Sequence, residues 1–118
     1  MASEQPSLSL HVKIFIDPSS VDKFFEAWDT VYAAVCAEPE LTFFEVYHNP
    51  EKPGELKWVE NWNATVEWLL NVQLKKEYYK PYLAATEPLF IKEREFEIWT
   101  RYPRNKWTYV ADEMVKKA

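Results

Sequence analysis

Two kinds of hydrophobic spacing alternate along this chain, and their order limits the folds that it can adopt. From Leu8 to Ile16 the apolar residues occupy every second position, which is the spacing of a strand with one buried face. From Val21 to Val35 they recur every three or four positions, which predicts an amphipathic helix of about 18 residues. The chain therefore begins with a strand and a helix, each of which has one face to bury.

Two further strands are predicted to form a hairpin. Residues 41–48 and 55–62 are rich in aromatic and β-branched side chains. The segment between them contains prolines and Gly54, the only glycine of the chain, as a turn requires. We therefore expect a hairpin across residues 41–62.

The sequence after the hairpin predicts helical structure and then a long strand. Asn63 can cap a helix whose apolar residues begin at Val66. Residues 75–88 predict another helical piece with a kink near Pro81, because proline lacks the amide donor. Residues 91–102 have the pattern of a final strand.

The resulting order, β-α-β-β-α-β, predicts an α+β fold of the ferredoxin-like type. Such a fold has a four-stranded antiparallel sheet with both helices on one face. We expect one domain over residues 1–118, with its core at about 8–102 and a C-terminal tail at 103–118.

The second face of the predicted sheet suggests a homodimer. That face would expose Phe15 and either Phe43 or Phe44 to water unless something covers it. A second copy of the sheet, packed face to face, is the simplest cover. The tail carries Trp107 and Tyr109 among charged residues, so we predict that it packs on the partner protomer.

Composition excludes several classes of partner. The net charge is −5 and the basic residues are scattered, which argues against binding of nucleic acid. No stretch approaches the roughly 20 apolar residues of a membrane span. No secretory signal precedes the first strand, so we expect a cytoplasmic protein.

The counts of cysteine and glycine exclude several kinds of bound group. Cys36 is the only cysteine, which rules out an internal disulfide and a cysteine-based zinc site, and we expect its thiol to be buried. A single glycine leaves no glycine-rich loop to hold a nucleotide phosphate. We expect neither a metal nor a cofactor.

Residues 58–99 hold most of the candidate site residues, because aromatic rings and isolated polar groups alternate there. Trp58, Glu60 and Trp62 share one face of a strand by their spacing of two. Burial between the two indoles would raise the pKa of Glu60, which suits a general base. The alternative is an ion pair of Glu60 with Arg94 or Arg101.

Three further polar residues would face the same cavity. Asn71, Tyr78 and Tyr82 fall on one helical face if the helix continues past Leu74. An amide and two phenols beside Trp58 and Trp62 would bind a small, flat, hydroxylated aromatic molecule. The alternative for the tyrosines is a subunit interface, which we favour more for Tyr79 than for Tyr78. His48, or else His11, is a second candidate base.

Several segments resemble the antibiotic biosynthesis monooxygenase (ABM) family. They are Val59-Glu60-Asn61-Trp62, followed by Trp68-Leu69-Leu70-Asn71, with HVKIFIDP, LTFFEVYHNP and EREFEIW at the first, second and last strands. The resemblance covers about residues 8–102. It implies a dimeric α/β barrel with a ligand cavity between the sheet and the helices of each protomer.

The resemblance also implies an activity, because some members oxygenate polycyclic phenols or quinones without metal or flavin. Its helical motif commonly has histidines at the positions of Asn71 and Lys76, and both are replaced here. We therefore expect an oxygenase acting on an aromatic or polyketide-like molecule, with Glu60, Asn71 and His48 as catalytic candidates. The alternatives are a binding or stress-related dimer without turnover, and a lyase or cyclase on the same fold.

Overall fold

A computed structural model of the chain describes residues 5–115. The last residues of the tail, 116–118, and residues 1–4 lie outside this range. The strands and helices are β1 (Leu8–Ile16), α1 (Val21–Cys36), β2 (Leu41–His48), β3 (Glu55–Trp62), α2 (Val66–Asn71), α3 (Tyr79–Thr86), β4 (Phe90–Thr100) and α4 (Asp112–Val115). Short 3₁₀ turns lie at 18–20, 73–75, 87–89 and 103–105.

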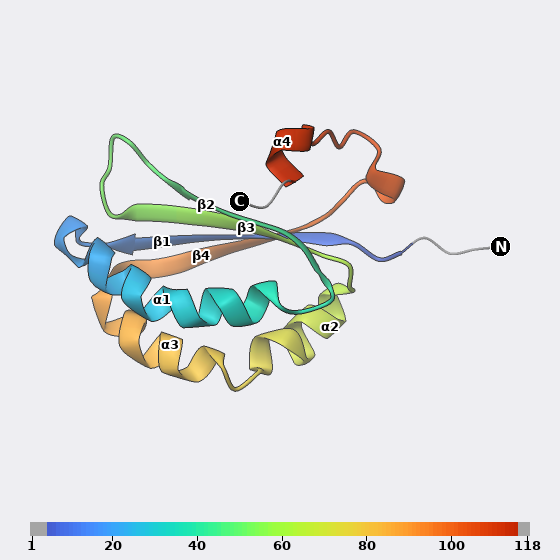
Figure 1. The fold of residues 1–118 in the computed structure, drawn as a ribbon. Coiled ribbons are helices and arrows are strands. Elements are labelled where there is room, and N and C mark those ends of the chain that lie inside the picture. Colours follow the sequence, from blue (N-terminus) through green and yellow to red (C-terminus); the bar gives the residue numbers. More distant parts are fainter. Residues whose placement is uncertain (1–4, 116–118) are drawn as a thin grey trace.

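The four strands form one antiparallel sheet, in the order β2-β3-β1-β4. Figure 1 shows α1, α2 and α3 together on one face of this sheet. The predicted ferredoxin-like α+β fold is therefore confirmed. Strands β2 and β4 form the two edges, and the central pair β1 and β3 carries the most buried side chains.

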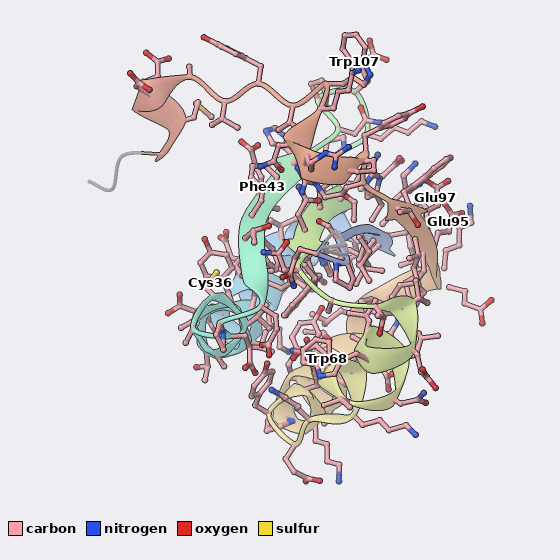
Figure 2. The ribbon with its side chains drawn as sticks, turned by 90° about the vertical axis from the view of Figure 1, so that its right-hand side faces the viewer. Cys36, Phe43, Trp68, Glu95, Glu97 and Trp107 are labelled. Atoms are coloured by element: carbon pink, nitrogen blue, oxygen red, sulfur yellow. The ribbon has the colours of Figure 1, made fainter. Side chains whose placement is uncertain are left out.

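Helix α1 is held on the sheet by aromatic side chains. Phe24 and Trp28 are buried on its inner face, and the ring of Trp28 lies 4.4 Å from that of Trp58 on β3. Each such side chain contributes roughly 1.5–3 kcal/mol by leaving water. Cys36, the last residue of α1, is exposed rather than buried as predicted, because it lies beside the buried face of the helix and not on it (Figure 2).

The connection from β3 to β4 differs from the prediction in two ways. The cap of α2 is Thr65, whose hydroxyl accepts from the amide of Trp68, and not Asn63. The helical path breaks after Asn71, not at Pro81. Proline is accommodated in the first turn of α3, where backbone amides have no helical partner to lose.

The face of the sheet opposite the helices is open, as the sequence predicted. Phe43 points to this face, whereas Phe44 packs in the core, with its ring 5.7 Å from that of Trp28. Figure 2 places Phe43 on one edge strand and Glu95 and Glu97 on the other. No helix within residues 5–115 is both long enough and apolar enough to cross a membrane.

The tail lies over this open face of its own chain (Figure 1). Val110 and Met114 lie across an open hollow of about 750 Å³ from Phe43 on β2. Trp107 and Tyr109 remain 81% and 87% exposed. The tail thus presents large apolar side chains that its own chain does not cover.

Gly54 closes the hairpin between β2 and β3. It has a φ of 93°, which side-chain-bearing residues rarely adopt. Its carbonyl oxygen accepts a hydrogen bond of 2.9 Å from the amide of Ile16, at the end of β1. A Cβ atom at this position would lie 2.0 Å from the backbone oxygen of Ile16. The close approach of two strand ends therefore depends on glycine.

Candidate functional site

Glu60 lies in the middle of β3, with its side chain under the helices. Its carboxylate accepts two hydrogen bonds of 2.9 Å, one to each oxygen. The donors are the indole Nε1 atoms of Trp58 and Trp62, two residues away on either side. Because alternate residues of a strand share a face, the sequence Trp-x-Glu-x-Trp builds this arrangement locally.

The surroundings of Glu60 favour proton exchange near neutral pH. The side chain is 7% exposed, and burial raises the pKa of its carboxyl group from 4.5 to about 7. The hydrogen bonds from Trp62 and Trp58 act in the opposite direction and limit the rise. The group can therefore accept and return a proton at physiological pH.

A cavity of about 130 Å³ lies beside Glu60, between the sheet and α3. The lining residues that carry a polar group are Glu60, Tyr79, Tyr82 and Arg94. The other lining residues are apolar or aromatic, namely Leu10, Val12, Trp58, Leu74, Leu83 and Phe96. This volume is smaller than the ~300–1,000 Å³ of drug-sized sites, and it suits a single ring.

The structure brings three of the predicted site residues together at this cavity. Trp58, Glu60 and Tyr82 all line it. Trp62 is fully buried and does not line it, but its indole holds the carboxylate of Glu60 from the side. Trp68 covers Trp62, with a ring separation of 5.9 Å.

The structure does not bring Asn71 or His48 to the cavity. Asn71 is exposed at the end of α2, because the helix stops there instead of continuing past Leu74. The expected common face of Asn71, Tyr78 and Tyr82 therefore does not form. His48 is exposed at the end of β2. His11 lies on the open face, where Ser9 Oγ is 2.9 Å from its Nε2.

Arg94 does not form the ion pair with Glu60 that the sequence analysis gave as an alternative. It lies in the cavity wall, with its guanidinium carbon 5.2 Å from the ring centre of Phe96. None of the ion pairs found between residues 5 and 115 involves Glu60. The cavity thus holds a cationic group as well as a buried carboxyl.

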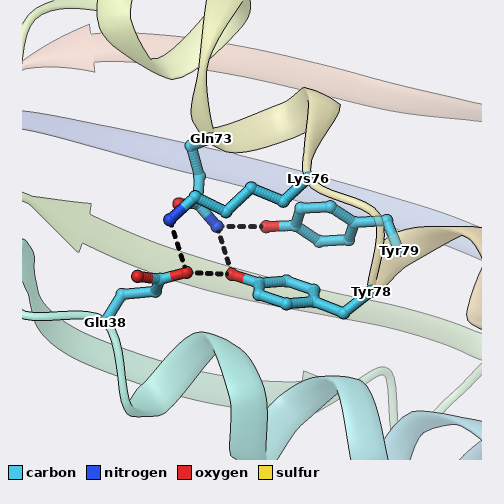
Figure 3. A network of polar contacts seen from close by, with 5 residues as sticks. All are labelled: Glu38, Gln73, Lys76, Tyr78 and Tyr79. Carbon is cyan, nitrogen blue, oxygen red and sulfur yellow. Dashed lines mark hydrogen bonds and ion pairs between the residues drawn. The ribbon is translucent and has the colours of Figure 1, made fainter.

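Tyr78 belongs to a polar network behind the cavity (Figure 3). Its hydroxyl donates to Glu38 at 2.6 Å and accepts from Gln73 at 2.7 Å. Lys76 also binds Glu38, at 2.8 Å. Sequence reasoning missed Gln73 and Glu38, and it favoured an interface role for Tyr79, which lines the cavity. In the sequence, the only local indication of this network is a glutamine, Gln73, a few residues before the adjacent Tyr78 and Tyr79.

The described part of the chain contains no group of three histidine, cysteine, aspartate or glutamate side chains arranged to hold a metal ion.

No protein-family model matches the chain. It is 42% identical to a protein of Pestalotiopsis microspora described as "Putative monooxygenase", over 90% of this chain and 88% of the relative.

Solved structures share the fold at low sequence identity. An antibiotic biosynthesis monooxygenase matches with a TM-score of 0.71 and 14% identity, over 81% of this chain and 99% of its own. A protein of Caulobacter crescentus CB15, described as a "putative antibiotic biosynthesis monooxygenase", matches with a TM-score of 0.74 and 17% identity, over 83% of this chain and 92% of its own. The chain therefore belongs to the same family as the monooxygenase-like protein of Pestalotiopsis microspora, and it has the fold of the antibiotic biosynthesis monooxygenases.

Proposed function

We propose that the protein is a monooxygenase that oxidises an aromatic or polyketide-like molecule with molecular oxygen, without metal or flavin. The observation that carries the proposal is the buried carboxyl group of Glu60, with a pKa of about 7, beside a cavity lined by aromatic rings. The name of the fungal relative supports the same type of reaction.

In the proposed reaction, Glu60 removes a proton from an activated CH₂ group of an anthrone-like substrate. The resulting carbanion passes one electron to oxygen, and the two radicals combine to a peroxide anion. Glu60 returns its proton to give the hydroperoxide, which loses water and leaves a carbonyl group. One oxygen atom enters the product, the other leaves as water, and the substrate supplies all the electrons.

The remaining cavity residues hold the substrate and exclude water. Trp58 and Tyr82 face the reacting ring, and the cation of Arg94 stabilises the anion that deprotonation creates. The 130 Å³ cavity has room for about one ring, so a substrate of several fused rings extends beyond it. Phe96, which is 51% exposed at the wall of the cavity, is available to contact the part that lies outside.

The test is incubation of the purified, metal-stripped protein with anthrone-type substrates, in air and under nitrogen. We expect oxygen uptake and a quinone product in air at well above the uncatalysed rate, and no product under nitrogen. Mass spectrometry with ¹⁸O₂ should place one labelled atom in the product.

Other outcomes separate the alternative functions. Product formation under nitrogen would favour a lyase or cyclase. Binding of the substrates without turnover in air would favour a non-catalytic binding protein. Either result would contradict the monooxygenase proposal.

We further propose that the protein functions as a homodimer, with two sheets packed through their open faces. The apolar groups on this side include Phe43, Tyr47 and Trp99, which are 36%, 43% and 58% exposed. Exposed aromatic groups concentrated on one side of a small protein mark an interface. The uncovered Trp107 and Tyr109 of the tail support its placement against the partner.

Removal of residues 103–118 is expected to weaken the dimer, because it deletes apolar side chains proposed to lie in the interface. Light scattering of the full chain at micromolar concentration should give twice the monomer mass of 14.1 kDa. The shortened chain should shift toward monomer as it is diluted. A full-length monomer at micromolar concentration would contradict the dimer and the role of the tail.

A further inference from the structure

Arg94 lies at an irregularity in the pairing of β4 with β1. Two residues of β4, Glu93 and Arg94, lie opposite the single residue Ile14 of β1. A β-bulge of this kind re-aims side chains and is common beside active sites. Among the described residues that line the cavity beside Glu60, Arg94 is the only cationic one. The bulge is thus located where β4 supplies the positive charge of the cavity wall.

Two observations place the guanidinium group of Arg94 on the cavity side of the strand. Its central carbon lies 5.2 Å from the ring centre of Phe96, which also lines the cavity. Its charge also acts on Tyr82, another lining residue: burial raises the pKa of this phenol, and the charge of Arg94 opposes the rise. The charge of Glu60 acts on the same phenol in the upward direction. Tyr82 therefore lies within electrostatic reach of both charged groups.

Within residues 5–115, the guanidinium group of Arg94 has no acceptor. No carboxylate of this range lies within ion-pair distance of it, and no side-chain hydrogen bond uses it. Arg101, by contrast, donates to Ser7, Asn105 and Thr108. A guanidinium carries five N–H donors in one plane, and their partial loss of water is offset only when they find acceptors. The partly buried Arg94 thus offers unused donors at the cavity.

We propose that Arg94 binds a carboxylate group of the ligand, so that the substrate is an aromatic molecule carrying a carboxylic acid. The two oxygens of a carboxylate match two parallel N–H groups of a guanidinium, which makes the hydrogen bonds short and fixes their direction. The second edge of the guanidinium stays available to the anion formed by deprotonation. The inference rests on the proposed function for the location of the site, but not for the reaction.

Binding of benzoate and of benzamide tests this inference without turnover. The two molecules have nearly the same shape and fit a single-ring cavity, but only benzoate is charged at neutral pH. We expect the unmodified protein to bind benzoate more tightly in calorimetric or NMR titrations. Arg94→Met keeps an aliphatic chain against Phe96 but removes the charge. It should weaken benzoate binding about tenfold, the value of a charged hydrogen bond at a partly exposed site, and leave benzamide binding unchanged.

Two further variants distinguish the geometry of the guanidinium from its charge. Arg94→Lys keeps the charge but loses the paired N–H groups, so it should bind benzoate better than Arg94→Met and less well than the unmodified protein. Lys92→Met is the matched control, because it removes a cation from the same strand. Its ammonium group lies 4.4 Å from the ring centre of Phe15, and the residue does not line the cavity. Both affinities should stay unchanged in this control.

The pH dependence of binding tests whether benzoate occupies the cavity of Glu60. A carboxylate bound there disfavours the ionised form of Glu60, whose pKa is about 7, so benzoate should bind several-fold more tightly below this pH than above it. Tyr79 and Tyr82 keep their protons in this range, because burial raises the pKa of both. Neither histidine lines the cavity. The difference between the two pH ranges should disappear in Glu60→Gln, while the preference for benzoate persists.

Three results would overturn the inference: no preference of the unmodified protein for benzoate, equal weakening of both molecules in Arg94→Met, or an equal loss of benzoate binding in Lys92→Met. Benzoate has no activated CH₂ group, so its binding is measured without product formation. A benzoate preference that persists where the oxygenation test fails would leave only the proposed reaction wrong. Turnover of anthrones by a protein without this preference would retain the reaction and exclude the carboxylate.

Discussion

Glu60→Gln is expected to lower oxygen-dependent turnover of an anthrone-type substrate by at least about 100-fold, the usual contribution of a general base. Glutamine keeps the size of the side chain but cannot take up a proton. Its NH₂ group would also face an indole N–H, where the native oxygen accepts at 2.9 Å. Steady-state oxygen uptake gives the rate, and circular dichroism checks that the variant is folded.

The pH profile adds a second readout to this experiment. The base must be ionised, so turnover of the unmodified protein should rise with pH through about 7, the pKa of Glu60, and then level off. This rise should be absent from any residual activity of Glu60→Gln. Glu51→Gln, at an exposed position in the turn between β2 and β3, is the matched control and should retain both the rate and the profile. Full activity in the Glu60→Gln variant would exclude Glu60 as the base.

Gly54→Ala is expected to destabilise the protein by about 3 kcal/mol or more, from backbone strain and a steric clash. The φ of 93° is strained for alanine, and its Cβ would lie 2.0 Å from the Ile16 oxygen. Because the clash is with backbone, relief requires β1 and the hairpin to separate, which lengthens the Ile16–Gly54 hydrogen bond. Urea denaturation at equilibrium gives the change in the free energy of unfolding.

Pro53→Ala is the control for this measurement. It changes the exposed neighbouring residue but adds no atom at position 54, where a Cβ would meet the Ile16 oxygen. It should change the free energy of unfolding by less than about 1 kcal/mol. An alanine variant at position 54 with native stability would show that the turn can adopt another conformation at little cost.

The strands were predictable because their signal is local. The spacing of two residues is continuous in β1, residues 41–48 and 55–62 are rich in aromatic and β-branched side chains, and turn residues mark the ends, so the predicted bounds agree with the structure. The region from Asn63 to Leu89 was not predictable from local sequence, because the path of its backbone depends on which side chains become buried. Pro81 suggested a break that the first turn of α3 avoids, and the actual break leaves Gln73 in the core.

The candidate site also has a part that the sequence predicted and a part that it did not. Trp58, Glu60 and Trp62 lie within five consecutive residues of one strand, so their common face follows from the sequence. To predict where Asn71 lies, the length of α2 had to be known, and the expected helix was longer than the observed one. Glu38 binds Tyr78 across 40 positions of sequence, and no local pattern connects them. The catalytic and binding roles of all these residues stay predictions.

The position of β2 and β4 at the sheet edges bears on how copies of this protein can meet. An open edge strand offers unpaired amides and carbonyls to any other strand, which promotes aggregation. Along β4 the side chains of Lys92, Glu93, Arg94, Glu95 and Glu97 place charges of both signs beside that edge. On β2 the pairing with β3 is irregular between Leu41 and Phe43, which bends the strand. Both edges thus resist strand addition, so the chain can carry many exposed aromatic rings without growing into extended sheets.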